Sequence, residues 1–328
     1  MSNVAALDPG TANLVVCTPT EKGSKVVRMR NSFLEIPKDA FSLKMLKQMG
    51  VPYYEKGSKL YLVGDDSFEL ASTFAKELRR PMASGVIASG EMEAVPMITR
   101  MIEKLLTDSG VTENARVAYS CPANPIDTEI DNVFHKSIIE GALRHLKMTP
   151  VEVVEAHAVA LDALGDDDFT GIALSFGGGM VNTCVCFRSM PIVSFSSCRS
   201  GDWIDAKTAK ACGEVTSRIT ALKEDTKTRL DPESTDRRLA ALYAYYQEVV
   251  SYTLQNIKDK LESGDNMPSF KKPIPMVIAG GTAMVPGFID LFEKVFYQTV
   301  FPVEISEIRL VKDPLYSVAR GCLVMASM

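Results

Sequence analysis

The stretch "LSFGGGMVNT", residues 174–183, decides how this chain folds. Its three consecutive glycines, Gly177, Gly178 and Gly179, interrupt an apolar run that resumes at once with strand-forming residues. Glycine weakens a strand that contains it, so the backbone here needs a conformation or a close approach that only glycine allows. A tight hairpin turn would meet that need, and so would a loop whose N–H groups surround an anion.

Two further glycine turns occupy comparable places. Residues 7–11 read Leu-Asp-Pro-Gly-Thr between two strand-like runs, and residues 174–178 read Leu-Ser-Phe-Gly-Gly in the same setting. A third turn, Gly280-Gly281-Thr282-Ala283, follows a strand-like run and precedes a helical pattern, a passage that lets a ligand approach the backbone. Each one alone is more simply a turn. Together, two similar strand–turn–strand units predict a duplicated domain with a ligand cleft between the copies.

Hydrophobic periodicity predicts alternating strands and helices, which favours a mixed α/β fold in both halves. Strand-like runs occur at residues 4–7, 14–18, 60–63, 117–120, 172–176, 184–187, 192–195 and 276–279. Helical patterns occur at residues 91–107, 126–146, 205–212, 216–229, 234–263 and 285–298. Residues 264–275 are rich in Pro, Gly and charge, and they predict a surface connection.

Composition limits the classes of partner and the compartment. The chain has 328 residues and a net charge of −5, which argues against nucleic-acid binding. We expect no transmembrane segment, because no run of ~20 apolar residues occurs, and no amphipathic helix at the N-terminus. The seven cysteines form no C-x-x-C pair, so reduced thiols in the cytoplasm are expected. Cys184 and Cys186 read as small core residues rather than metal ligands.

The order and wording of the motifs resemble the actin-like ATPase superfamily, and within it the bacterial actin homologues of the MreB/MamK type. The motifs that carry this resemblance are "LDPGTANLVV" (7–16), "RPMASGVIA" (80–88), "YSCPANPIDTEID" (119–131), "VEVVEAHAVALDALG" (151–165), "LSFGGGMVN" (174–182), "RSGDWID" (199–205), "VIAGGTAMVPG" (277–287) and "DPLYSVARGCLV" (313–324). The resemblance implies an actin-like (ribonuclease H-like) α/β fold, with duplicated domains forming two lobes around a nucleotide cleft.

The same resemblance implies the limits of the lobes. The first lobe would comprise residues 1–150 plus 312–328, with an insert subdomain at about residues 31–65. The second lobe would comprise residues 151–311, with an insert at about residues 200–263. This second insert is reduced and is expected to be all-helical, because a segment of only residues 225–234 separates the Lys223-Glu224 motif from the next long helix.

The resemblance also implies ATP or ADP with Mg²⁺ as cofactors and gives each turn a role. Asp8 would act in catalysis through the magnesium shell, contacting the metal indirectly through water. The phosphates would lie against two turns, and the adenosine against the third turn and a Lys-Glu pair. These cofactor-binding positions are Gly10, Thr11, Ala12, Asn13, Gly177, Gly178, Gly179, Lys223, Glu224, Gly280, Gly281, Thr282 and Ala283. A solvated ion pair is the alternative for Lys223 and Glu224.

Glu129 occupies the place where the resemblance implies the acid that orients the attacking water. We expect it in the first turns of a helix, with Asn124 as the N-cap and Pro125 at the first helical position. The alternative is that Asp127 and Glu129 only complement the dipole of that helix.

Four positions depart from the pattern of the family. Ser175 stands where the family has an aspartate that helps to hold magnesium, so metal affinity and hydrolysis are in question. Met180 and Val181 replace threonines after the glycines, and Ser89 replaces an acidic residue. The first phosphate turn is therefore intact and the second is eroded.

The sequence predicts a cytoplasmic, filament-forming cytoskeletal protein whose self-association is controlled by ATP and which hydrolyses ATP slowly, if at all. The alternative is a nucleotide-binding scaffold of the actin fold without turnover, which Ser175 and the short second insert favour. A sugar kinase is a third class, but we find no candidate for the aspartate base that such an enzyme requires.

Overall fold

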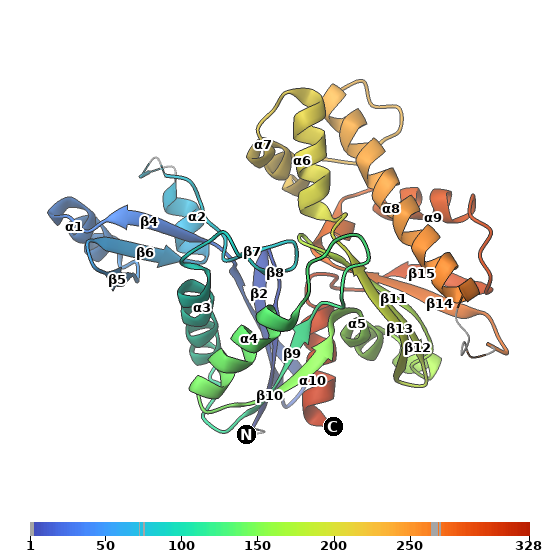
Figure 1. The fold of residues 1–328 in the computed structure, drawn as a ribbon, viewed down its shortest axis with the longest axis horizontal. Coiled ribbons are helices and arrows are strands. Elements are labelled where there is room, and N and C mark those ends of the chain that lie inside the picture. The colour runs from blue at the N-terminus through green and yellow to red at the C-terminus, as the bar shows by residue number, and fades with distance from the viewer. Residues whose placement is uncertain (1–2, 72, 75, 264–267, 269) are drawn as a thin grey trace.

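Two five-stranded sheets form the centre of the protein (Figure 1). The computed structural model describes residues 3–71, 73–74, 76–263, 268 and 270–328. The first sheet has the order β10-β9-β1-β2-β3, with bounds Thr149–Val154, Arg116–Cys121, Val4–Pro9, Asn13–Thr20 and Gly23–Arg30. The second has the order β13-β12-β11-β14-β15, with bounds Met190–Ser197, Val181–Phe187, Gly171–Phe176, Ile274–Ala279 and Ile305–Leu310.

The two sheets repeat one topology. In each, three consecutive strands form an antiparallel meander, β1-β2-β3 in the first sheet and β11-β12-β13 in the second. Two later strands then extend each sheet in parallel: β9 pairs with β1 and β10 with β9 in the first sheet, and β14 pairs with β11 and β15 with β14 in the second. The predicted duplication and the mixed α/β fold are therefore confirmed.

Two helices pack between the sheets, α5 (Glu155–Ala163) and α10 (Ser317–Ser327) (Figure 1). The buried residues of the layer between the two sheets are mostly Ala, Val and Cys. A Cβ added at Gly321 of α10 would lie 1.7 Å from the backbone oxygen of Ala158 in α5. Glycine is therefore required where these helices cross. Their close approach brings the two sheets near each other.

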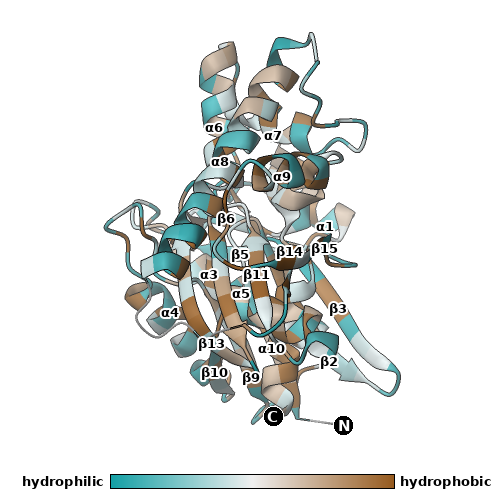
Figure 2. Cartoon of the chain, turned by 90° about the vertical axis from the view of Figure 1, so that its right-hand side faces the viewer, coloured by the Kyte–Doolittle hydropathy of each residue, from teal (hydrophilic) through white to brown (hydrophobic). Residues whose placement is uncertain are grey.

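Helices also cover the outer faces of the sheets. α3 (Ala94–Asp108) and α4 (Val133–His145) pack on the first sheet, and α8 (Arg237–Ser263) and α9 (Phe288–Phe296) pack on the second. Strand alternation explains the layers, because Ile172 and Leu174 face α8 and α9 whereas Ala173 faces α5 and α10. Figure 2 shows hydrophobic colour on β9, β11 and β13, whereas the outer part of β3 is pale to hydrophilic.

The remaining elements extend each half. In the first half, β4 (Phe33–Pro37), β5 (Tyr54–Lys56) and β6 (Lys59–Val63) form a three-stranded sheet with α1 (Ala40–Met49) and α2 (Asp65–Ala71). In the second half, α6 (Gly201–Cys212) and α7 (Thr216–Glu224) precede α8, and residues 200–263 contain these three helices and no strand, in agreement with the predicted helical insert. Short elements complete the list: β7 (Met82–Ala83), β8 (Val86–Ile87), η1 (Gly165–Asp167) and η2 (Gly281–Met284).

All eight predicted strands are present, but one predicted helix begins in the wrong place. The pattern over residues 126–146 predicts a helix capped by Asn124, whereas α4 begins at Val133. Instead, Pro125 forms a β-bridge with Ser196, and the Ile126 N–H donates to the Ser196 backbone oxygen at 2.9 Å. Asn124 is therefore not an N-cap, because the edge of β13 provides backbone partners that the local pattern cannot reveal.

The other differences are smaller. Residues 151–154 of the 151–165 motif belong to β10, and α5 begins after them at Glu155. Helix α7 ends at Glu224, before the predicted limit at residue 229. Residues 264–267 and 269 of the predicted surface connection lie outside the described residues. Among the described helices, none is both long and apolar enough to cross a membrane.

Candidate functional site

The first two glycine turns lie against each other. A Cβ added at Gly178 would lie 3.4 Å from the Ala12 Cβ, and one added at Gly179 would lie 2.2 Å from the Thr11 Oγ1. The turns also have the same internal geometry, because a Cβ at Gly10 would lie 2.8 Å from the Asn13 backbone oxygen, and one at Gly177 would lie 2.8 Å from that of Met180. The structure thus brings together two equivalent turns from different sheets.

The third turn joins them. Gly280 has a φ of 95°, and a Cβ there would lie 2.3 Å from the Phe176 backbone oxygen. The Thr282 hydroxyl donates to the Gly177 backbone oxygen at 2.8 Å, and the buried Tyr246 hydroxyl donates to the Thr282 backbone oxygen at 3.0 Å. We call the region where residues 8–13, 177–180 and 280–283 meet the glycine junction. Its backbone geometry requires glycine at several points, which explains the composition of the motifs.

Sequence reasoning missed a residue that supports the first turn. The Asn31 side chain donates to the Gly10 backbone oxygen at 2.9 Å, and the Asn31 N–H donates to the Ala12 backbone oxygen at 2.9 Å. Asn31 is fully buried. It fixes the turn from the segment between β3 and β4, which no motif singled out.

Two carboxyl groups approach each other beside the junction, Asp8 on β1 and Glu155 at the start of α5. Strand alternation puts Asp8 on the same face as Ala6, and Ser175 on the same face as Ala173. Both faces are turned to the layer that holds α5. The Ser120 hydroxyl donates to Asp8 Oδ1 at 2.6 Å.

Glu155 accepts two hydrogen bonds from the second sheet. The Ser175 hydroxyl donates to Glu155 Oε1 at 2.7 Å, and the Asn182 side-chain amide donates to Glu155 Oε2 at 2.9 Å. The Ala123 N–H in turn donates to Asn182 Oδ1 at 3.1 Å. Ser175 lacks the carboxylate of the family pattern, but its hydroxyl holds a carboxylate that comes from α5.

Burial makes both carboxyl groups hard to ionise, and the charge of Asp8 adds to this effect at Glu155. Burial raises the pKa of Asp8 to about 6, although the hydrogen bond from Ser120 opposes the change. Burial, followed by the charge of Asp8, raises the pKa of Glu155 to about 8, against the hydrogen bond from Ser175. Two such groups beside the glycine junction fit a hard divalent cation, because carboxylate oxygens are ligands that Mg²⁺ prefers and its charge relieves their repulsion.

Glu155 was absent from the predicted site. Its signal was its place immediately after the strand "VEVV" and at the start of a helix rich in alanine, which puts a carboxylate at the carboxyl end of the edge strand β10. That signal is weak without knowledge that Ser175 and Asn182 lie opposite.

Glu129 lies on an exposed loop, not in a helix. The neighbouring Asp127 is used structurally, since its carboxylate accepts from the Ser197 hydroxyl at 2.8 Å and from the Cys198 N–H at 3.0 Å. The helix-dipole alternative for Asp127 and Glu129 is wrong, because α4 begins only at Val133. The catalytic role of Glu129 stays a prediction.

Lys223 and Glu224 have different surroundings. Lys223 Nζ lies 2.8 Å from Asp205 Oδ1 and donates to the Gly201 backbone oxygen at 3.2 Å, and its side chain is only 10% exposed. A solvated ion pair is therefore wrong for Lys223, which contacts the base of α6 beside the junction. Glu224 is half-exposed and lies 3.5 Å from Arg30 Nη2 of the first half.

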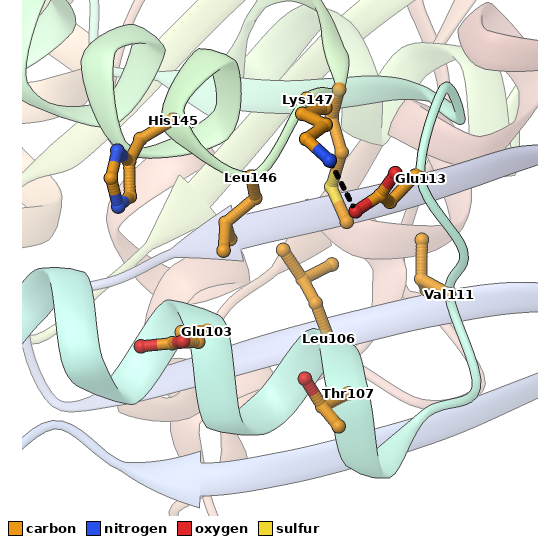
Figure 3. A pocket seen from close by; sticks show the side chains of 9 residues that line it. Glu103, Leu106, Thr107, Val111, Glu113, His145, Leu146 and Lys147 are labelled. Atoms are coloured by element: carbon orange, nitrogen blue, oxygen red, sulfur yellow. Dashed lines mark hydrogen bonds and ion pairs between the residues drawn. The ribbon is translucent and has the colours of Figure 1, made fainter.

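A hollow of about 210 Å³ occurs elsewhere, between the ends of α3 and α4 (Figure 3). Its floor is apolar, with Leu106, Val111 and Leu146, and the Lys147–Glu113 ion pair lies at its rim at 2.8 Å (Figure 3). None of the predicted site residues lines it, so we do not assign the nucleotide site there.

We compared the chain with family models, curated proteins and solved structures. A sequence profile for the family described as volactin matches residues 3–326. The chain belongs to the volactin family. The cell division protein FtsA of Enterococcus hirae is 25% identical to this chain over 173 residues, which are 47% of the chain and 37% of FtsA. FtsA of Enterococcus faecalis is 24% identical over 177 residues, 48% of the chain and 38% of FtsA. The match thus spans less than half of these curated relatives.

Several solved structures resemble the structure of this chain over nearly its whole length. The MamK double helical filament has a TM-score of 0.74 at 18% identity, covering 99% of this chain and 98% of that one. MreB5 of Spiroplasma citri bound to AMPPNP has a TM-score of 0.68 at 16% identity, covering 97% and 94%. EutJ of Carboxydothermus hydrogenoformans has a TM-score of 0.59 at 13% identity, covering 98% and 89%. These likenesses confirm the predicted actin-like two-lobe fold.

Proposed function

We propose that this protein is a cytoskeletal, actin-like protein that binds ATP with Mg²⁺ at the glycine junction and self-associates into filaments under the control of the bound nucleotide. The observation that carries the proposal is the contact between two equivalent glycine turns beside the Asp8–Glu155 pair. Similar solved structures support it, because one is a MamK filament and others are MreB5 of Spiroplasma citri bound to ADP or AMPPNP.

Each part of the junction has a place in this proposal. N–H groups of the turns at Gly10–Asn13 and Gly177–Gly179 bind the phosphates. Gly280–Ala283 bounds the adenosine, with Lys223 and Glu224 on its far side. Asp8 and Glu155 face the magnesium shell, and Mg²⁺ supplies neutralisation of the charge that develops on the phosphates. Glu129, on its exposed loop, orients water only after the loop approaches the phosphates.

Nucleotide controls assembly by favouring one arrangement of the two lobes, whose predicted limits (residues 1–150 with 312–328, and 151–311) we keep as part of the proposal. A ligand shifts such an equilibrium only by its difference in affinity for the two states. ATP that contacts both phosphate turns has such a difference, because it bridges groups from different sheets. Slow hydrolysis of the bound ATP in the cytoplasm then returns the lobes to the arrangement in which subunits dissociate from the filament.

A non-hydrolysing scaffold is the second candidate, and the neutral Ser175 and apolar Met180 beside the second turn favour it. Both candidates bind nucleotide at the same place. The two candidates differ in whether phosphate is released from bound ATP: the filament protein with slow hydrolysis requires this release, and the non-hydrolysing scaffold excludes it.

Equilibrium dialysis with labelled ATP and Mg²⁺ tests the shared claim. In Gly179→Ala the new Cβ meets Thr11 and the Gly85 backbone nitrogen at 2.2 and 2.3 Å, so the turns must separate and ATP binding should weaken at least ~10-fold. Gly141→Ala is the matched control, because a Cβ there meets nothing within 4 Å. Thr282→Val, which removes one hydrogen bond to Gly177, repeats the test if Gly179→Ala does not fold. Unchanged ATP affinity in folded Gly179→Ala or Thr282→Val contradicts the assignment.

A further inference from the structure

The short hairpin β7–β8 belongs to the first half of the molecule. Met82 and Ile87 are buried in the core on the outer face of the first sheet, and the Ala88 N–H donates to the Pro81 backbone oxygen at 2.9 Å. Ser84 and Gly85 form its tip with φ values of 48° and 75°, the left-handed conformations of a tight two-residue turn. The hairpin is therefore a rigid extension of the first half.

The tip of this hairpin touches both phosphate turns at once. The Gly85 N–H donates to the Thr11 hydroxyl at 3.1 Å. A Cβ at Gly85 would lie 2.6 Å from Met180 Cγ, and one at Gly179 would lie 2.3 Å from the Gly85 nitrogen. Met180, one of the departures from the family pattern, thus packs against the tip. Figure 1 shows β7 and β8 between the two large sheets.

An ion pair at the base of the hairpin joins the same two halves. Arg80 Nη1 and Nη2 donate to Asp202 Oδ1 and Oδ2 at 3.2 and 2.9 Å, a bidentate geometry. Asp202 lies in the first turn of α6, and its N–H donates to the Gly178 backbone oxygen at 2.8 Å. The Ser200 hydroxyl donates to that oxygen at 2.7 Å. Arg80 is thereby connected through Asp202 to the second phosphate turn.

We propose that the β7–β8 hairpin and the Arg80–Asp202 pair form a latch between the two halves, and that this latch sets the rate at which nucleotide leaves the glycine junction. The latch rests on the proposed nucleotide site. Nucleotide held by both turns leaves only when the turns separate, and separation breaks the tip contact and the ion pair together. The apolar Met180 is then a contact for the tip rather than a lost phosphate ligand.

Dissociation of a fluorescent ATP analogue, chased with unlabelled ATP, tests the latch in three variants: Arg80→Ala, Asp202→Ala and the double variant. Both side chains are partly exposed, so each single substitution should speed dissociation about 5-fold. The double variant should also be about 5-fold faster and not about 25-fold, because the two groups act as one pair. Arg229→Ala breaks an exposed ion pair of the second half, with Asp290, and should leave the rate unchanged.

Three results overturn the latch alone. The first is release of the analogue at the wild-type rate from Asp202→Ala but faster release from Arg80→Ala, which makes Arg80 a direct phosphate contact. The second is multiplication of the two single effects in the double variant, and the third is release at the wild-type rate from all three variants. A wild-type protein that binds no ATP analogue overturns the proposed function, and the latch with it, so the two failures are distinguishable.

Discussion

Replacing Glu155 by glutamine should make the nucleotide-free protein more stable at pH 9 and not at pH 5. Glu155 has its pKa raised from 4.5 to about 8, so the folded state holds a proton that the unfolded state releases between these pH values. Its contribution to stability is therefore fully present below about pH 4.5 and is lost as pH rises through about 8. At about 1.4 kcal/mol per unit, the loss is about 5 kcal/mol.

Glutamine cannot ionise, so the variant avoids this loss. It weakens the hydrogen bonding, because glutamine offers one acceptor oxygen where Glu155 offers two, so either the Ser175 hydroxyl or the Asn182 amide loses its acceptor, at a cost of about 2 kcal/mol. The net expectation is a gain of about 3 kcal/mol at pH 9 and a loss of about 2 kcal/mol at pH 5.

The assay is urea unfolding at pH 5, 7 and 9 in EDTA without nucleotide. Glu152→Gln is the matched control, because it makes the same change in charge three residues earlier, on an exposed side chain of β10. Its difference from wild type should vary little with pH. If the stability difference between Glu155→Gln and wild type stays constant from pH 5 to pH 9, the argument that burial and the charge of Asp8 raise the pKa of Glu155 is refuted.

Substitutions at Ser175, at the crossing of α5 and α10, and at Glu129 test other parts of the account. Ser175→Asp puts a second carboxylate at the 2.7 Å contact with Glu155, so without metal it should lower the free energy of unfolding at pH 9 by about 3 kcal/mol. In thermal melts, Mg²⁺ should restore more stability to this variant than to wild type. Equal responses to Mg²⁺ would argue against a metal at this position. Gly321→Ala should cost about 3 kcal/mol in urea unfolding, since its Cβ meets the Ala158 oxygen at 1.7 Å, whereas a cost below about 1 kcal/mol would show that α5 and α10 can separate freely. Glu129→Ala should abolish phosphate release in a colorimetric assay while leaving ATP affinity intact, and unchanged release would remove Glu129 from the catalytic assignment.

The sequence predicted the parts of this protein that depend on local pattern. Apolar runs such as those at residues 172–176 and 276–279 are strands because both faces of a central strand are buried. The three glycine turns were predictable because close backbone approaches exclude side chains, and they meet in the structure as the duplication implied. Lys223 also lies beside the junction, although paired with Asp205.

What the sequence did not reveal depends on partners from distant segments. Pro125 pairs with the edge of β13 instead of beginning a helix, and a local capping pattern carries no information about that edge. Glu155 gains its significance from Ser175 and Asn182, which come from strands β11 and β12 of the second sheet. The β7–β8 strands have two residues each, too few to produce a periodic pattern.

High-speed pelleting of the purified protein is the most direct test of the proposed function. Samples with Mg²⁺ and ATP are compared with nucleotide-free samples, and Gly179→Ala and Gly141→Ala are run beside wild type. We predict that wild type and Gly141→Ala pellet only with nucleotide and that Gly179→Ala stays in the supernatant. Wild-type protein that stays in the supernatant with ATP across salt and protein concentrations would contradict nucleotide-controlled filament formation.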